Sequence, residues 1–415
     1  MNSVVLKNVR PFDGEGFAEE QTVNIVEGVW APSAPEGTPE FDAKGALAIP
    51  APFGLGLDFQ APLRDDVYTF EAGFEAMRRG GFYGGLYESA ANPIDDSEKL
   101  CAMLERVKKE PLDIVLLGAF SVGFGSEMLS EMLDINEGVA GFGDGNASFP
   151  SVRFLRLAME YGSMTGKRFF FMPMDRSLRK SGVVNEGGPS DTLGMKGIPF
   201  IAETIAAFTI LELSAFLKVP VHFKQVTSAA TLGLVSRARE RGLDVTCDVD
   251  IHHLLFDDSA LLELNSAHHL CPPLRSESDK LALIEGLKSG LVNAISFNHT
   301  PVLRQDTEVN FEDSVPGAVS LEIGVPALWT FLEAELGAKK AVELLSYAPA
   351  KIAGVRKAEL APGKHADFLV LDTHREHLVT AKDFAGQVCN SPFLGKELPA
   401  TILGSFVGSS WRQNA

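Results

Sequence analysis

Hydrophobic and polar positions follow one pattern at the two ends of the chain and another in the middle. Near both ends, apolar and polar residues alternate over short runs that stop at glycine or proline, which is typical of strands with one buried face. The runs are SVVLKNVRPFDG (3–14), QTVNIVEGVWAP (21–32), ADFLVLDT (366–373), HLVTAKDF (377–384) and ATILGSFVGSSWR (400–412). The sequence therefore predicts β-rich segments at the two ends.

In the middle of the chain, short apolar runs alternate with segments of helical periodicity. The apolar runs are RFFFMPMD (168–175), VPVHFKQV (219–226), LDVTCDVDIHH (243–253) and VNAISFNHT (292–300). Continuous apolar strands separated by helices indicate buried parallel strands, and repetition around a closed sheet gives an α/β barrel. The chemistry of such barrels lies at the carboxyl ends of the strands. Here those ends read MPMD (172–175), KQVT (224–227), DIHH (250–253) and FNHT (297–300).

Length, charge and cysteine content narrow the expected domain number, partner class and compartment. A chain of 415 residues fits one large barrel with a small accessory domain. The net charge of −18 argues against nucleic acid or an anionic membrane as a partner, although a protein with a basic face remains compatible. Four scattered cysteines without a C-x-x-C pair, no apolar leader and no run of ~20 apolar residues favour a cytoplasmic protein.

Four long segments resemble the dihydroorotases of the amidohydrolase superfamily. They are LDVTCDVDIHHLLF (243–256), CPPLRSESDKLALIEGLKSGLVNAISFNHTP (271–301), LLSYAPAKIAGVRKAELAPGKHADFLVLD (344–372) and SPFLGKEL (391–398). The resemblance covers nearly the whole chain. It implies a (β/α)8 TIM-type barrel over 50–355 and a small β-sandwich domain formed jointly by 1–49 and 356–415.

The same resemblance implies zinc-assisted hydrolysis of a cyclic amide, but the positions that would bind metal have changed. Zinc prefers imidazole, thiolate and carboxylate ligands. The family's His-x-His is missing from FGLGLDFQAP (53–62), and the other metal positions also differ. The changed positions are Gly56, Asp58, Met172, Gln225 and Asn298, while Asp144 is a retained acid. His222 lies three residues before Gln225, so regular strand alternation predicts that the two face opposite ways. We expect no bound zinc and no other cofactor.

The positions that would hold substrate or handle protons have changed as well. They are Asn298, Gln60, Ala90, Cys271 and Val302, so no family catalytic residue remains. Arginine and asparagine donors are what would hold a carboxylate and an amide ring, and these have gone. The adjacent pairs His252–His253 and His268–His269 are poor chelates, because neighbours on a strand point to opposite faces. A vestigial pocket could still contain Asp58, Asp144, Asp175, Gln225 and His299, and Asp58 with Asp144 could hold a hard cation such as Mg²⁺.

Two functional hypotheses follow. The first is a non-catalytic dihydroorotase homologue of pyrimidine biosynthesis. The resemblance implies a structural role, because in some bacteria inactive dihydroorotase-like chains hold together the catalytic trimers of aspartate transcarbamoylase; a homodimer or a hetero-oligomer would fit. The second is an enzyme with altered, metal-free cyclic-amide hydrolase chemistry. A mouth plugged by bulky side chains such as Met172 and Phe59 favours the first, and an open polar pocket favours the second. An active dihydroorotase with an atypical site is a third reading.

Overall fold

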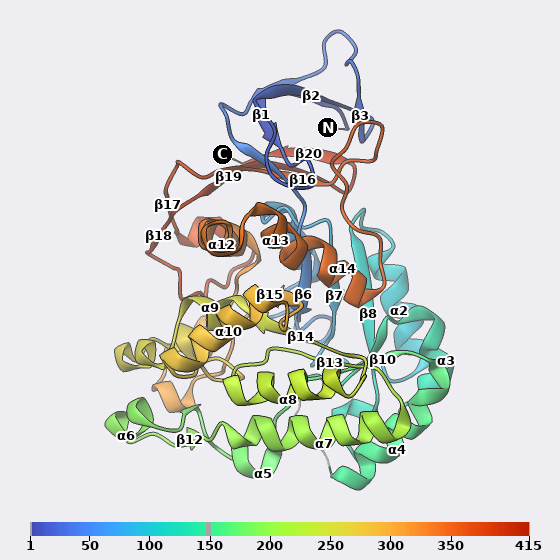
Figure 1. The fold of residues 1–415 in the computed structure, drawn as a ribbon, viewed down its shortest axis with the longest axis vertical. Coiled ribbons are helices and arrows are strands. Elements are labelled where there is room, and N and C mark those ends of the chain that lie inside the picture. Colours follow the sequence, from blue (N-terminus) through green and yellow to red (C-terminus); the bar gives the residue numbers. More distant parts are fainter. Residues whose placement is uncertain (1, 147–150, 415) are drawn as a thin grey trace.

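A computed structural model describes residues 2–146 and 151–414 (Figure 1). Eight parallel strands form the central sheet, in the spatial order β15-β14-β13-β10-β9-β8-β7-β6. They are β6 (Phe53–Leu57), β7 (Gly84–Tyr87), β8 (Asp113–Ala119), β9 (Gly141–Gly143), β10 (Arg168–Phe171), β13 (Val221–Phe223), β14 (Val245–Asp250) and β15 (Ala294–Ser296). The predicted barrel is confirmed.

The barrel closes between its first and last strands just beyond β15. The Phe297 amide donates to the Leu55 carbonyl at 3.0 Å, and the His299 amide donates to the Gly56 carbonyl at 2.9 Å. The Asp58 amide then donates to the His299 carbonyl at 3.2 Å. The segment FGLGLDF therefore forms the first barrel strand and directly adjoins the last one.

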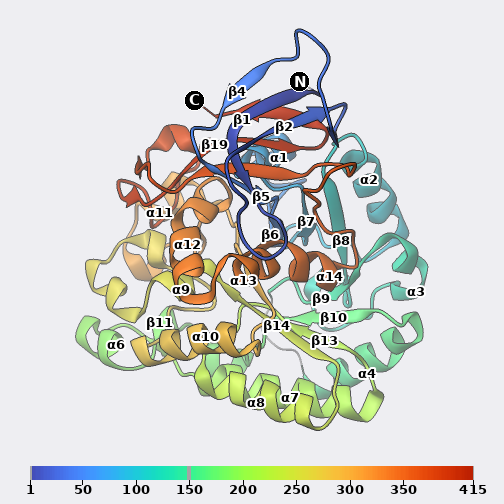
Figure 2. The same cartoon turned by 45° about the horizontal axis from the view of Figure 1, so that its top comes forward.

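Helices surround the barrel strands (Figure 2). The helices of eight or more residues are α1 (Phe70–Arg79), α2 (Ser97–Val107), α4 (Val152–Gly162), α7 (Ile201–Leu217), α8 (Ala229–Glu240), α10 (Glu277–Ser289) and α12 (Leu321–Leu336). Shorter ones are α3 (Met132–Ile135), α5 (Arg176–Arg179), α6 (Gly188–Leu193), α9 (Ile251–Leu255), α11 (Arg304–Thr307), α13 (Ala338–Val342) and α14 (Ala348–Ala353). No helix among the described residues is both long and apolar enough to span a membrane.

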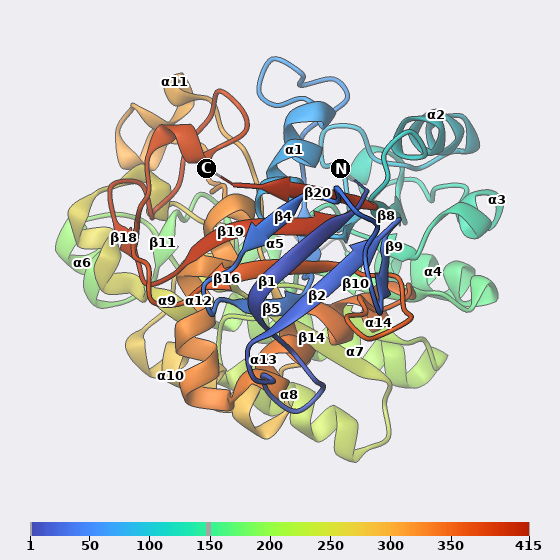
Figure 3. The same ribbon diagram turned by 90° about the horizontal axis from the view of Figure 1, so that it is seen from above.

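Both ends of the chain build a second eight-stranded sheet, which lies over one end of the barrel (Figures 1 and 3). Its strands are β1 (Val4–Pro11), β2 (Gln21–Val26), β3 (Val29–Ala31), β4 (Glu40–Asp42), β5 (Leu47–Pro50), β16 (Phe368–Asp372), β19 (Thr401–Val407) and β20 (Ser410–Gln413). Two-stranded pairs join β11 (Val184–Asn185) to β12 (Gly197–Ile198), and β17 (His377–Leu378) to β18 (Glu397–Leu398).

Strand β16 is apolar up to Asp372 because both of its faces are buried. Phe368 and Val370 belong to a core that the sheet forms with β1, β2, β19 and β20. Leu369 and Leu371 point the other way and belong to the core of the barrel. Alternate side chains of one strand face opposite sides, so a strand buried on both faces carries no polar alternation.

Candidate functional site

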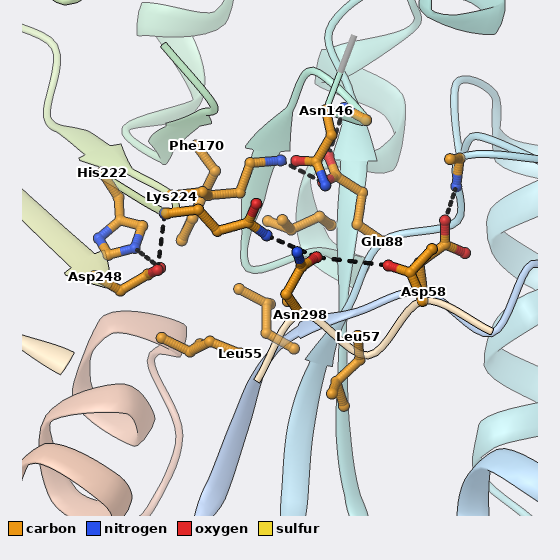
Figure 4. Close-up of a pocket in the computed structure, with 17 residues that line it drawn as sticks. Leu55, Leu57, Asp58, Glu88, Asn146, Phe170, His222, Lys224, Asp248 and Asn298 are labelled. Atoms are coloured by element: carbon orange, nitrogen blue, oxygen red, sulfur yellow. Dashed lines mark hydrogen bonds and ion pairs between the residues drawn. The ribbon is translucent and has the colours of Figure 1, made fainter. Parts of the chain in front are cut away.

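A small cavity lies at the carboxyl ends of the barrel strands, where barrel enzymes carry their chemistry (Figure 4). Its volume is about 30 Å³, compared with the ~300–1,000 Å³ typical of small-molecule sites. A water molecule needs ~10–15 Å³ by a comparable measure, so this cavity has room for roughly two waters. The polar residues around it are Asp58, Glu88, Asn146, His222, Lys224, Gln225, Asp248, Asn298 and Thr300.

Gly56 lines the cavity and has a backbone that favours glycine. Its φ is +73°, a conformation that side chains with a Cβ rarely adopt. A Cβ there would lie 3.1 Å from the Asn298 amide nitrogen and 3.5 Å from Nε2 of Gln225. The space beside this glycine is thus already filled by the backbone of Asn298 and the side chain of Gln225.

A buried lysine lies at the centre of the site. The Nζ of Lys224 is 2.5 Å from Oε2 of Glu88 and 3.0 Å from Oδ1 of Asp144, and all three side chains are at least 88% buried. We call these three residues the Lys224 cluster. The two carboxylates raise the pKa of Lys224 well above its usual value, against the opposing effect of burial, so the ammonium stays charged.

Backbone amides hold both carboxylates of the Lys224 cluster in place. The Gly145 amide donates to Oε1 of Glu88 at 2.9 Å, and the Met172 amide donates to Oδ2 of Asp144 at 3.0 Å. Gly143, in β9, makes room for this arrangement, because a Cβ there would lie 1.8 Å from Oε1 of Glu88.

A second polar network fills the barrel next to the cluster. The Asp248 carboxylate is 2.8 Å from Nε2 of His222, and it accepts from the Gln225 amide at 2.8 Å and from the Ser296 hydroxyl at 2.6 Å. Burial lowers the pKa of His222, which favours the neutral imidazole.

His222 and Gln225 both line the cavity, and the His222 imidazole and the Gln225 backbone amide bond to the same carboxylate, that of Asp248. Strand β13 ends at Phe223, and Gln225 has a φ of +54°. The alternation of side chains does not continue past the end of the strand. The side-chain amide of Gln225 donates to Oδ1 of Asn298 at 3.0 Å, so two of the positions that the resemblance predicts as former metal ligands bond to each other.

Two acids near the cavity have raised pKa values. Burial raises the pKa of Asp58 to about 7, although its carboxylate accepts from the amides of Gln60 and Ala90. Burial also raises the pKa of Asp144 to about 6, against the opposing effect of Lys224. Both carboxyl groups thus titrate nearer to neutrality than an exposed aspartate does.

The other predicted positions lie in or beside this region with different partners. Met172 and Cys271 belong to an apolar cluster with Met174, Ile198 and Ala202. Gln60 donates to the Pro301 carbonyl at 2.6 Å, Ala90 lines the cavity, and Val302 is buried. Phe59 does not plug the mouth, because its ring packs behind the strand among Tyr68, Phe70, Phe74, Tyr87 and His299.

Three residues considered for the vestigial pocket lie outside the cavity lining: Asp144, which pairs with Lys224, and also Asp175 and His299. Asp175 caps α5, where its carboxylate accepts from the amides of Ser177 and Leu178. His299 faces α12, and its Nδ1 accepts from the amides of Ser320 and Leu321 at 3.2 and 3.3 Å.

The interpretation of the two histidine pairs as poor chelates assumed that they lie on strands, but neither pair does. His252 and His253 lie on helix α9, and Nδ1 of His252 is 2.6 Å from the carboxylate of Asp250, which caps that helix. His268 ends a short 3₁₀ helix and His269 follows it directly. His269 contacts a neighbouring side chain of the protein, because its Nδ1 is 2.8 Å from the Ser314 hydroxyl.

Comparison with known proteins decides the family. No protein-family model matches the chain. A dihydroorotase from Pelotomaculum thermopropionicum is 31% identical over 407 residues, which cover 94% of this chain and 95% of the relative. The chain belongs to the dihydroorotase family. A dihydroorotase-like protein from Pseudomonas aeruginosa is 32% identical over 381 residues, covering 90% of this chain and 89% of that one.

The fold comparison agrees with this dihydroorotase relationship. The L-hydantoinase from Arthrobacter aurescens matches with a TM-score of 0.83, covering 99% of this chain and 96% of that structure, at 20% identity. A D-hydantoinase from Thermus sp. matches with a TM-score of 0.78 at 18% identity. At these identities the likeness is one of fold alone.

The residues of this dihydroorotase homologue do not fit the zinc that the resemblance implies. Zinc requires imidazole, thiolate or carboxylate ligands, usually three or four from the protein. Over 2–146 and 151–414 there is no group of three or more His, Cys, Asp or Glu residues that could hold a metal ion. The carboxylates of Glu88 and Asp144 already bind the Lys224 ammonium.

Sequence reasoning missed the central residue of the site. Lys224 stands in KQVT, directly after a buried strand and next to Gln225. The available signal was a lysine at the carboxyl end of a barrel strand, with acids such as Asp58, Glu88 and Asp144 at other strand ends. Which of these acids would meet the lysine depends on how the barrel closes.

Proposed function

We propose that this chain is a non-catalytic member of the dihydroorotase family with a structural role in pyrimidine biosynthesis. The observation that carries the proposal is the Lys224 cluster, because an ammonium lies between two carboxylates at the barrel mouth. A lysine ammonium has no empty coordination position, so it can neither polarise a carbonyl as a Lewis acid nor activate a bound water as zinc does. The cavity of about 30 Å³ is also too small for a cyclic amide.

The proposal is tested by assay and by metal analysis of the purified protein. We expect no hydrolysis of dihydroorotate, with or without added zinc, and less than stoichiometric metal by mass spectrometry. Hydrolysis together with one or more bound zinc ions per chain would contradict the proposal. A relative that has the family's His-x-His serves as the positive control for the assay.

For the structural role we propose aspartate transcarbamoylase as the partner, within a hetero-oligomer in the cytoplasm. The support is the family membership of the chain combined with the altered site. Affinity purification from the source cells, followed by mass spectrometry, tests this. Recovery of the transcarbamoylase in a fixed ratio is the expected result, and a homodimer without it would count against this partner.

The second candidate is a metal-free hydrolase, and one observation favours it. Asp58 and Asp144 have pKa values of about 7 and 6, and acids poised near neutrality are common in active sites. Dihydroorotate and hydantoin hydrolysis in the presence of EDTA tests this candidate. Activity that Asp58→Asn abolishes would establish it over the structural role.

A further inference from the structure

The mismatch between this site and zinc points to a specific replacement. We propose that the ammonium of Lys224 is the resident cation of the barrel mouth and takes the charge-compensating place of the metal. The proposal concerns how the site is held together, so it stands or falls independently of whether the chain catalyses a reaction.

Buried carboxylates are costly when no cation accompanies them. The Glu88 and Asp144 side chains are 12% and 6% exposed, and an unpaired charge at such depth is strongly disfavoured. Glu88 and Asp144 are both within 3.0 Å of Nζ of Lys224. The site therefore contains its own cation, covalently tethered to the end of β13.

Backbone amides hold both carboxylates in addition to the cation. Glu88 accepts from the Gly145 amide, and Asp144 accepts from the amides of Asn146 and Met172 at 3.1 and 3.0 Å. These contacts come from loops that follow different barrel strands, so the two carboxylates are held together by the fold. Such an arrangement attracts whatever cation is present.

A metal at this site would have to displace the ammonium. Lys224 is 7% exposed, and its ammonium could leave only by moving a four-carbon chain through packed surroundings or by losing a proton. Loss of the proton is disfavoured next to two carboxylates. Divalent cations should therefore not stabilise the wild-type protein through this site.

Removal of the tethered cation tests the proposal directly. We expect Lys224→Ala to lower the Tm measured by circular dichroism. Propylammonium chloride, which resembles the missing end of the side chain, should restore part of the loss, and so should Mn²⁺, a hard cation that prefers oxygen ligands. Sodium chloride at equal ionic strength should raise the Tm of Lys224→Ala no more than it raises the Tm of wild type. Neither propylammonium nor Mn²⁺ should raise the Tm of the wild-type protein more than sodium chloride does at equal ionic strength.

Two variants provide matched controls. Lys224→Arg keeps the positive charge, so it should show a smaller loss than Lys224→Ala and no response to added cations beyond that of wild type. Lys339→Ala removes an exposed lysine that pairs with Glu15 at 2.6 Å, and it should leave the Tm nearly unchanged.

A charge-neutral triple variant keeps the proposal falsifiable if Lys224→Ala fails to fold. Combining Lys224→Met with Glu88→Gln and Asp144→Asn removes the cation and both anions together. We expect this triple variant to have a higher Tm than Lys224→Met alone, because buried ion pairs can be replaced by neutral groups at little cost, whereas a half-removed pair is costly. A triple variant less stable than Lys224→Met would overturn the proposal, as would a stable Lys224→Ala that ignores both cations.

Discussion

At the scale of one residue, Gly56 stands at a predicted metal position and leaves no room for a ligand side chain. It has no ligand atom, its φ of +73° disfavours any side chain, and the backbone of Asn298 lies against it. A histidine there would need both a different backbone conformation and the space that Asn298 and Gln225 occupy. The backbone of Asn298 and the side chain of Gln225 therefore both limit what can stand at this position.

Gly56→Ala tests this close packing. Gly166 is a matched control, because its φ of +68° is similar and a Cβ there would meet nothing within 4 Å. Gly166→Ala should cost about 1 kcal/mol, the penalty for a left-handed conformation. Gly56→Ala should cost roughly 2 kcal/mol, since overpacking adds to that penalty. The free energy of unfolding from urea denaturation measures both, and equal losses would contradict the close contact.

Residue types alone predicted which donors were missing, but not what replaced them. Gly56, Met172 and Asn298 could be recognised as poor zinc ligands from their chemistry alone. The role of Lys224 depends on Glu88 and Asp144, which lie 136 and 80 positions earlier in the chain. Only closure of the barrel brings the three side chains together. Patterns in the sequence therefore did not reveal that Lys224 pairs with Glu88 and Asp144.

At the scale of elements, the periodicity predicted the strands well and their ends poorly. The apolar run VPVHFKQV predicted a strand, and β13 does form there, but it stops at Phe223. Lys224 follows the strand, and Gln225 has a left-handed backbone. Lys224 and Gln225 lie in this irregular segment, where the period-two rule for side-chain direction no longer applies.

Helix α12 depends on His299 at its amino-terminal end. Because Nδ1 of His299 accepts from the amides of Ser320 and Leu321, His299→Phe keeps an aromatic ring but leaves both amides without an acceptor. We expect a loss of about 1–3 kcal/mol in the free energy of unfolding, the usual cost of unpaired buried donors. Urea denaturation at neutral pH measures it, and an unchanged midpoint would rule out this capping role.

The same histidine predicts a pH dependence. Burial lowers the pKa of His299 to about 3, whereas unfolded histidine titrates near 6.5. Between these values the unfolded state binds the extra proton, so the contribution of His299 is complete above pH ~6.5 and is lost as the pH falls towards ~3. The acid-side slope of stability should be shallower in His299→Phe than in wild type. His374→Gln, at an exposed position, should keep the wild-type slope.

At the scale of the whole molecule, the barrel followed from alternating strands and helices, and the resemblance supplied the association of the two chain ends. That association is visible in β16, which pairs with β5 from the first 50 residues and with β19 near the carboxyl end. Pairings between residues more than 300 positions apart leave no local pattern. Periodicity could identify these strands but not their neighbours.

The net charge of −18 predicts opposite effects of salt on the chain and on the proposed complex. Self-repulsion destabilises a compact acidic protein, so the Tm of the isolated chain should rise as added salt shortens the Debye length from ~30 Å at 0.01 M to ~10 Å at 0.1 M. Attraction to a basic face of the transcarbamoylase would weaken over the same range, mainly through slower association.

Calorimetry and surface plasmon resonance across that salt range would measure the two effects. A Tm that falls with salt would mean that surface ion pairs outweigh the net repulsion. If the association rate of the complex does not change with salt, the partner binds through uncharged surface. The net negative charge of the chain would then play no part in recognition.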